Sequence, residues 1–277
     1  MREVRVLKGH GTGNDFVLLP DLDGHLDLTD EQIQALCDRR FGIGGDGVLR
    51  IVRSAACDDP DATGAEFFMD YRNADGSTAQ MCGNGIRVFA RFLVEEGLAD
   101  PAGMDIATRG GVLHVRRLDS GEYAVGMGVA TGMETIASVM VGNRSYPATG
   151  VHVPNPHAVV FVTSVNSAGP LDRAPEVSPE HLFPEGVNVE FVEQIAPGYV
   201  RMRVHERGVG ETLSCGTGAC AVAWAVRRRG DTSERIRVDV PGGTLHVEER
   251  DGELELIGPA IIVADGMLEA DWAASWI

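Results

Sequence analysis

Two cysteines in this chain stand in front of nearly the same sequence. Cys82 opens the stretch CGNGIRVFARFLVEEG, and Cys215 opens CGTGACAVAWAVRRRG. In both, a Gly-x-Gly triplet follows the cysteine, and a mostly apolar run leads to a closing glycine. Because a helix that is apolar on every side is usually a buried one, both runs predict buried helices that begin at a cysteine.

A cysteine at the start of a helix is placed for proton transfer. The first backbone N–H groups of a helix have no internal partner, and the helix dipole adds partial positive charge there. A thiol in this position is easier to ionise, and its pKa can fall well below about 8.5. Glycine neighbours also leave the backbone bare, so a ligand carboxylate can approach the N–H groups. Each stretch therefore predicts an acid–base group beside an anion site.

Two equivalent thiols suit a particular kind of reaction. Nucleophilic catalysis needs one cysteine with a histidine nearby, and disulfide exchange usually uses CxxC. A racemase or epimerase needs one group to remove a proton from a carbon and a second to protonate its opposite face. The simpler alternative is that the cysteines are small buried hydrophobic residues. That alternative suits Cys220, inside the second run, while Cys37 and Cys57 lack the glycine context.

The two stretches belong to an internal repeat. A shift of 133 residues places Cys82 on Cys215 and Asn73 on Glu206, and with a one-residue slip GGVLHV at Gly110 matches GGTLHV at Gly242. Such a repeat predicts two lobes of one ancestral fold. We expect a first lobe over residues 1–125, a second lobe over 126–262, and an active site in the cleft between them.

Most of the remaining sequence predicts short strands. Segments such as EFFMDYR, HAVVFV, NVEFVEQ and YVRMRVHE are rich in apolar or alternating residues and are bounded by turn-forming residues. One further helix is predicted over TDEQIQALCDRR, with Thr29 as its N-cap. We predict a mixed α/β (α+β) fold in which each lobe is a curved, mostly antiparallel sheet around one central buried helix.

Composition excludes several classes of function. The chain has 277 residues and a formal net charge of −17, which argues against a nucleic-acid or anionic-membrane partner. There is no CxxC pair and no histidine at ligand spacing from a cysteine, so we expect no metal site. The segment GIGGDG at Gly42 fits a dinucleotide fingerprint, but it follows a helix pattern and precedes a strand, the reverse of the required order. We expect no cofactor, and the lack of a signal-like N-terminal segment favours a cytoplasmic protein.

The motifs resemble those of one family almost from end to end. KGHGTGNDF, RRFGIGGDGVL, YRNADGSTAQMCGNGIRVFARFL, VPNPHAVVFV, FPEGVNVEFV, VHERGVGETLSCGTGACA and VPGGTLHV are similar, in order and spacing, to those of the diaminopimelate epimerases. The resemblance implies interconversion of LL- and meso-2,6-diaminopimelate without a cofactor, in lysine and peptidoglycan precursor synthesis. It also implies a homodimer and a C-terminal tail (residues 263–277) packed on the first lobe.

The resemblance assigns roles to particular residues. Cys82 and Cys215 become the catalytic acid–base pair, and His157 and Glu206 adjust the pKa values of the cysteines. The implied substrate-binding residues are Asn14, Asn73, Gly83, Asn84, Asn155, Asn188, Glu206, Arg207, Gly216 and Thr217.

Some alternatives remain open at the level of sequence. The asparagines of RNADGS and VPNPH also suit plain turns, and His157 also suits a structural histidine. Gly47 stands where many family members have glutamine, so no contact is assigned to it. A proline or hydroxyproline racemase of the same fold is the nearest rival enzyme, and a redox-sensing amino-acid-binding protein is the rival from another class.

Overall fold

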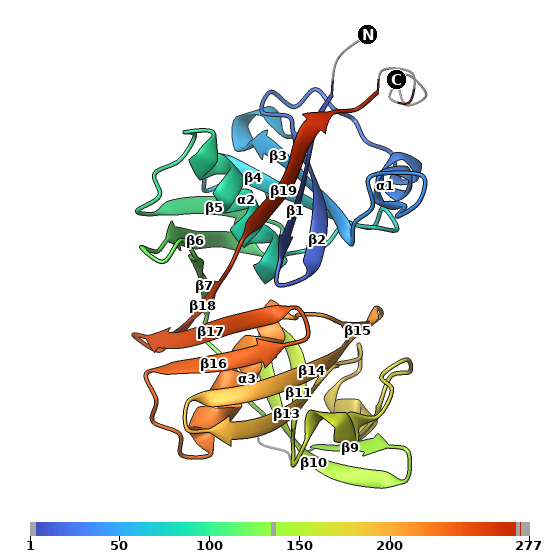
Figure 1. The fold of residues 1–277 in the computed structure, drawn as a ribbon, viewed down its shortest axis with the longest axis vertical. Coiled ribbons are helices and arrows are strands. Elements are labelled where there is room, and N and C mark those ends of the chain that lie inside the picture. Colours follow the sequence, from blue (N-terminus) through green and yellow to red (C-terminus); the bar gives the residue numbers. More distant parts are fainter. Residues whose placement is uncertain (1–3, 134–136, 270–271, 273–277) are drawn as a thin grey trace. The chain divides into compact units, whose positions relative to one another are not determined.

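The structure is a computed structural model that describes residues 4–133, 137–269 and 272. Its chain divides into two compact units (Figure 1). Unit 1 comprises residues 1–125 and 259–277, and unit 2 comprises residues 126–258. Unit 2 is therefore an insertion between two parts of unit 1. Residues 270–271 and 273–277 of the expected C-terminal tail lie outside the described part.

Unit 1 is a curved sheet with two α-helices. Its strands are β1 (Arg5–Gly11), β2 (Asn14–Pro20), β3 (Gly47–Arg53), β4 (Phe67–Asn73), β5 (Met104–Thr108), β6 (Gly111–Arg117), the start of β7 (Tyr123–Gly128) and β19 (Ile261–Met267). Its helices are α1 (Asp30–Cys37), α2 (Gly83–Glu95) and the short 3-10 turn η1 (Ser54–Ala56). Strand β19 pairs antiparallel with β1, so the end of the chain completes this sheet.

Unit 2 repeats the same plan. Its strands are β8 (Thr131–Gly132), β9 (Ala137–Val141), β10 (Arg144–Val153), β11 (Asn155–Val162), β12 (Glu176–Ser178), β13 (Asn188–Ala196), β14 (Tyr199–Glu206), β15 (Gly210–Thr212), β16 (Arg235–Val240), β17 (Gly243–Arg250) and β18 (Glu253–Gly258). Its helix is α3 (Gly216–Arg228), and its 3-10 turns are η2 (Val165–Ala168) and η3 (Glu180–Leu182).

The strand pairing shows how closely the units correspond. In unit 1 the pairs from β1 through β2, β3, β4, β5 and β6 run antiparallel, parallel, antiparallel, parallel and antiparallel. The pairs from β10 through β11, β13, β14, β16 and β17 of unit 2 follow the same sequence. The predicted fold class is confirmed: each unit is mostly sheet, mostly antiparallel, and built around one helix.

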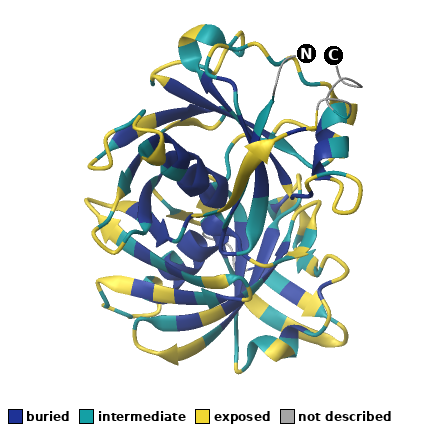
Figure 2. Cartoon of the chain, turned by 45° about the horizontal axis from the view of Figure 1, so that its top comes forward, coloured by how far each residue is buried: buried dark blue, intermediate teal, exposed yellow. Residues whose placement is uncertain are grey.

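The central helices are buried, as their composition predicts. Helices α2 and α3 each have 13 residues and begin 133 positions apart, at Gly83 and Gly216. Helix α2 packs against β1, β2, β3, β6 and β19, and α3 packs against β10, β11, β13, β16, β17 and β18. Figure 2 shows both helices as mostly buried. Because the sheet surrounds each helix, its apolar side chains are covered on nearly all sides.

Helix α1 is shorter than predicted. Thr29 is its N-cap, and a capping box with Gln32 fixes its start as expected. The helix ends at Cys37 rather than Arg40, because Asp38 has an extended backbone and its side chain accepts from the N–H groups of Arg40 and Phe41, both at 2.7 Å. These local hydrogen bonds compete with a further helical turn.

Candidate active site

Both cysteines are N-cap residues of the central helices. Cys82 has an extended backbone, and its sulfur accepts from the N–H of Gly85 at 3.4 Å. Cys215 does the same at the start of α3, where its sulfur accepts from the N–H of Gly218 at 3.3 Å. The prediction of two helices that begin at a cysteine is confirmed. Each sulfur lies in the positive field of a helix N-terminus.

Three asparagine and aspartate side chains organise the surroundings of Cys82. The thiol donates to Asn14 Oδ1 at 3.4 Å, and Asn84 Nδ2 donates to the same oxygen at 3.3 Å. Asn14 Nδ2 in turn donates to Asp46 Oδ2 at 2.7 Å, which fixes the orientation of the amide. The structure therefore places two predicted binding residues, Asn14 and Asn84, directly beside Cys82.

A buried arginine supports this first helical turn. Arg87 is completely buried, and it donates to Gly83 O at 2.9 Å, to Asn84 Oδ1 at 3.0 Å and to Pro259 O at 3.2 Å. Sequence reasoning did not single out this residue, because it lies within an otherwise apolar run. Its hydrogen bonds satisfy the buried guanidinium and hold the start of α2 in place.

Cys215 lies in a more acidic environment. It is only 5% exposed, and its sulfur is 3.4 Å from Thr217 Oγ1. Glu206, the last residue of β14, hydrogen-bonds to Cys215 and accepts from the hydroxyl of Thr212. Burial, followed by the charges of Glu206 and Glu190, raises the pKa of Cys215 well above its ordinary value. The helix start alone predicts the opposite direction, so that expectation is wrong for Cys215.

The pKa of Glu206 is also raised, chiefly by burial. Hydrogen bonds from Thr212 and Cys215 act in the opposite direction, toward the ionised form. A carboxyl group with a raised pKa can hold or release a proton next to the thiol. This contact agrees with a role for Glu206 in adjusting the state of Cys215.

His157 belongs to a buried chain of side chains in unit 2. It is completely buried, and its Nδ1 lies 2.7 Å from Glu190 Oε1 while its Nε2 lies 2.8 Å from Asn155 Oδ1. Asn155 begins β11 and is not part of an isolated turn. The structure thus joins two predicted site residues, His157 and Asn155, directly, and it adds Glu190 on the other side of the imidazole, a residue that sequence reasoning did not identify.

The remaining predicted residues lie near strand ends. Asn73 ends β4, and its amide donates to Ser77 Oγ at 3.0 Å within a turn. Asn188 begins β13, is buried, and accepts from the backbone N–H of Arg207 at 2.9 Å. Asn73 therefore fits the turn alternative in this state, whereas Asn188 fixes the backbone that carries Arg207.

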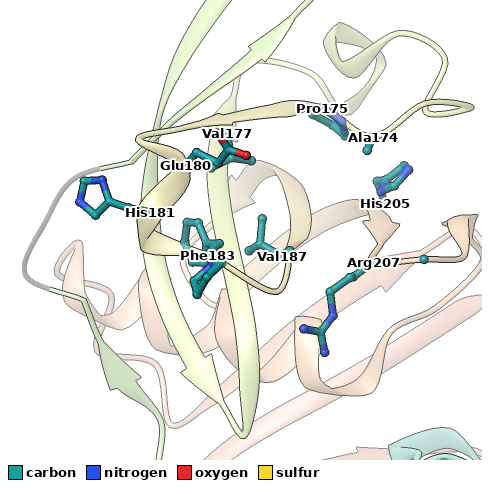
Figure 3. Close-up of a pocket in the computed structure, with 12 residues that line it drawn as sticks. Ala174, Pro175, Val177, Glu180, His181, Phe183, Val187, His205 and Arg207 are labelled. Carbon is teal, nitrogen blue, oxygen red and sulfur yellow. The ribbon is translucent and has the colours of Figure 1, made fainter.

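Arg207 borders a cavity of about 660 Å³ within unit 2 (Figure 3). The Arg207 side chain is 39% exposed, and its guanidinium donates to Glu185 O at 3.0 Å. His205 lies beside it, and Val177, Glu180 and Phe183 form other parts of the wall. A guanidinium on the rim of an open cavity can bind a carboxylate from solvent.

The other three cysteines, Cys37, Cys57 and Cys220, are not N-cap residues of the central helices. Cys220 is buried, as predicted for a core residue, Cys37 is also buried, and Cys57 is half-buried. Within the part of the chain that the structure describes, no group of three His, Cys, Asp or Glu side chains is arranged to hold a metal ion. None of the helices in residues 4–133, 137–269 and 272 has the length and hydropathy of a membrane span.

Solved structures with the same architecture define the class of fold. A phenazine biosynthesis protein of the PhzF family from Bacillus anthracis matches 97% of this chain and 100% of its own with a TM-score of 0.69, at 17% sequence identity. A hydroxyproline epimerase from Agrobacterium vitis matches 97% of this chain and 91% of its own with a TM-score of 0.64, at 15% identity. The chain therefore has the two-unit fold that these proteins share.

Sequence comparison identifies the family within this fold. The family model described as diaminopimelate epimerase matches residues 6–133 and 149–263. Diaminopimelate epimerase from Streptomyces coelicolor is 52% identical over 97% of this chain and 96% of its own length, and the protein of that name from Thermobifida fusca is 46% identical over 95% and 97%. This chain belongs to the diaminopimelate epimerase family, and it is an isomerase.

Proposed function

We propose that this enzyme interconverts LL- and meso-2,6-diaminopimelate by a two-base mechanism in which Cys82 and Cys215 exchange roles. The observation that carries the proposal is the matched pair of cysteine N-caps, one on each central helix. Their identical placement in a repeated fold suits two groups that act on opposite faces of one carbon.

In the chemical step, one proton passes from the substrate to one cysteine, and one proton passes from the other cysteine to the substrate. One cysteine, as the thiolate, removes the proton from Cα, and the electron pair of the broken C–H bond remains on the substrate. The other cysteine, as the thiol, delivers its proton to the opposite face and becomes the thiolate. The configuration at Cα is inverted, and the reverse reaction restores the first state. Because one cysteine acts on each face of Cα, the mechanism needs both sulfurs beside the same carbon. Either cysteine can be the thiolate that begins the reaction, depending on its direction.

The first turns of the two central helices supply the electrostatic part of catalysis. The N–H groups of Gly83, Asn84, Gly216 and Thr217 precede the helical hydrogen-bond pattern, and the dipole makes them favourable partners for an anion. We assign them to the substrate α-carboxylate, where they stabilise the charge that develops during proton removal.

The second amino-acid head of the substrate needs its own partners. We assign this end to Asn14, Asn73, Asn155, Asn188 and Arg207, because amides can serve either a carboxylate or an ammonium and a guanidinium can bind a carboxylate with two hydrogen bonds. Glu206 is assigned to Cys215, since it hydrogen-bonds to that thiol. His157 is assigned to adjusting the pKa values of the cysteines, which it does from its buried position beside Asn155. No metal or cofactor has a step in this scheme.

A deuterium-exchange experiment tests the proposal. Under reducing conditions in D2O, wild-type enzyme and meso-diaminopimelate are followed by NMR and compared with Cys82→Ser and Cys215→Ser. We expect the wild type to incorporate deuterium at Cα with inversion, and both variants to lose inversion. Cys57→Ser, which removes a half-buried thiol outside the two helix starts, is the matched control and retains activity. Inversion at the wild-type rate in either active-site variant would refute the two-thiol assignment.

The same experiment separates the rival functions. No exchange with diaminopimelate but exchange with proline or hydroxyproline would assign the enzyme to the racemases that share its fold. No exchange with any of these would favour a redox-sensing amino-acid-binding protein. We further infer from the family that the enzyme is a cytoplasmic homodimer, which light scattering after size-exclusion chromatography and cell fractionation test directly.

A further inference from the structure

Glu190 is a buried carboxyl group with an incomplete set of partners. It lies on β13, is completely buried, and contacts His157 Nδ1 through Oε1 at 2.7 Å. Its Oε2 has no hydrogen-bond partner among the described residues. A buried carboxyl group with one oxygen unpaired costs free energy. Stability of the core therefore does not account for Glu190.

Glu190 lies beneath the first turn of α3, next to Cys215. A Cβ atom built on Gly218 would be 2.8 Å from Glu190 Oε1 and 3.3 Å from Cys215 Sγ. The carboxyl oxygen and the sulfur are therefore at most about 6 Å apart, a range in which a buried like charge acts strongly. Only a glycine leaves room for both atoms at this point.

The equivalent strand positions in unit 1 carry apolar side chains. Glu190 is the third residue of β13, and its counterpart as the third residue of β3 is Leu49. His157 is likewise the third residue of β11, and its counterpart in β2 is Phe16. The register supports this match, because Phe16 lies opposite the first residue of β3 and His157 opposite the first residue of β13.

The contacts of Gly85 support the match of Leu49 with Glu190. A Cβ built on Gly85 would meet Leu49 Cδ2 at 3.3 Å and Phe16 Cζ at 3.4 Å, so these two apolar side chains lie beneath the first turn of α2. Beneath the first turn of α3, the carboxyl group of Glu190 takes the place of Leu49, and the imidazole of His157 holds the strand position that corresponds to Phe16. The repeat keeps the cysteine and the glycine in both units but replaces the pair beneath them.

We propose that Glu190 is a positioning residue for the epimerisation: it fixes the ring of His157 and places a carboxyl group beneath Cys215, which makes the two cysteine sites chemically different. This inference rests on the proposed two-thiol function. Glu190 acts on the reaction through its neighbours and does not itself contact the substrate.

Two effects follow from this arrangement. The contact with Nδ1 fixes the imidazole so that Nε2 faces Asn155 Oδ1, which orients an amide assigned to the substrate. The charged or titratable groups that face Cys215 are Glu190 from β13, Glu206 from β14 and, more distantly, His157 from β11. Burial and the two carboxyl groups raise the pKa of Cys215 and so favour its thiol form.

The test uses two variants: one removes the charge of Glu190, and the other replaces both Glu190 and His157. Glu190→Gln keeps the shape and an acceptor for His157 but removes the charge. The double variant His157→Phe/Glu190→Leu copies the unit 1 pair and replaces a buried polar pair by apolar residues, a change that proteins often tolerate. Glu193→Gln is the matched control, since Glu193 is also on β13 but accepts from the N–H of Val165 and lies away from Cys215.

The main readout is independent of substrate. Thiolate absorbance near 240 nm is titrated for each protein, and the signal of the same protein carrying Cys215→Ser is subtracted. We expect the Cys215 transition to move to lower pH in Glu190→Gln and in the double variant, because removal of a nearby negative charge favours the thiolate. In Glu193→Gln the transition stays in place. We expect kcat of Glu190→Gln to fall about tenfold, with the pH–rate profile shifted in the same direction.

Two results would overturn the inference. An unchanged Cys215 transition in a folded Glu190→Gln protein would show that the carboxyl group does not act on the thiol. Loss of the fold in both variants would show that the pair serves the core alone. Failure of the wild type to epimerise diaminopimelate would instead refute the proposed function, while the absorbance titration would still decide the effect of Glu190 on Cys215.

Discussion

Gly218 and Gly85 occupy the same position in the two helices, yet we expect the same substitution to have different effects on them. Each donates its N–H to the cysteine sulfur at the start of its helix. At Gly218 a new Cβ would lie 2.8 Å from Glu190 Oε1, which is closer than real Cβ contacts. At Gly85 its nearest neighbour would be Leu49 Cδ2 at 3.3 Å, the end of a flexible side chain. The substitution Gly→Ala at both positions therefore isolates the effect of Glu190.

The expected change in stability for each glycine variant is the sum of two opposing contributions. Alanine favours a helix over glycine by up to about 1 kcal/mol, and this gain is similar at both sites. Overpacking a buried position costs about 1–3 kcal/mol, and the geometry assigns this cost mainly to Gly218→Ala. We expect Gly218→Ala to be less stable than Gly85→Ala by about 2 kcal/mol, which corresponds to about 4–8 °C in melting temperature.

Urea unfolding and calorimetry of both variants measure this difference, and epimerisation assays measure its effect on catalysis. Because the new methyl group displaces either Glu190 or the Cys215 sulfur, we expect kcat of Gly218→Ala to fall at least about tenfold. A double-mutant cycle of Gly218→Ala with Glu190→Ala adds a sharper test. Removal of the obstructing oxygen should recover about 1 kcal/mol or more of the free energy of unfolding that Gly218→Ala loses. Equal stability of the two glycine variants, or independent effects in the cycle, would refute this reasoning.

Two further predictions concern unit 1. Burial raises the pKa of Asp15, but hydrogen bonds from Arg39 and Lys8 outweigh it and hold the pKa at about 2, below the ordinary 3.8. The stabilisation is therefore complete above pH 3.8 and is lost as the pH falls through about 2. After a discount for screening by solvent, we expect Asp15→Asn to lower the free energy of unfolding by about 1 kcal/mol at pH 7 and by less at pH 3, as urea titrations at both pH values can show. We expect Arg87→Met to lower that free energy by about 3 kcal/mol or more, because two carbonyls and Asn84 Oδ1 lose a charged donor; a change below 1 kcal/mol in calorimetry would contradict this.

The parts of the fold that the sequence predicts are those with local signals. The starts of α2 and α3 are marked by a cysteine and two glycines, and their burial by an apolar run, so both helices are found where expected. The start of α1 is marked by Thr29 and Gln32. Its end is not, because the side chain of Asp38 replaces helical hydrogen bonds with its own.

The site was harder to predict because its partners are distant in the sequence. Arg87 reads as an exposed interruption of an apolar helix, but a carbonyl 172 residues away, at Pro259, accepts from it. Glu190 reads as an alternating strand residue, and only the pairing of β13 with β11 places it against His157. The helix dipole is a local effect, whereas the carboxyl groups that oppose it at Cys215 come from other strands. The catalytic and binding roles of the predicted residues stay predictions until the variants are measured.

The pairing of β19 with β1 has a consequence for how the chain is made. Unit 1 begins with the first described strand and is completed by residues that follow Pro259, while the whole of unit 2 lies between them. On the ribosome, β1 therefore emerges early and keeps one open edge until almost the entire chain has been synthesised. An unpaired edge strand is a site for aggregation. Unit 2, which is continuous, can fold first, so nascent chains that stall before β19 would expose β1 to chaperones or to one another.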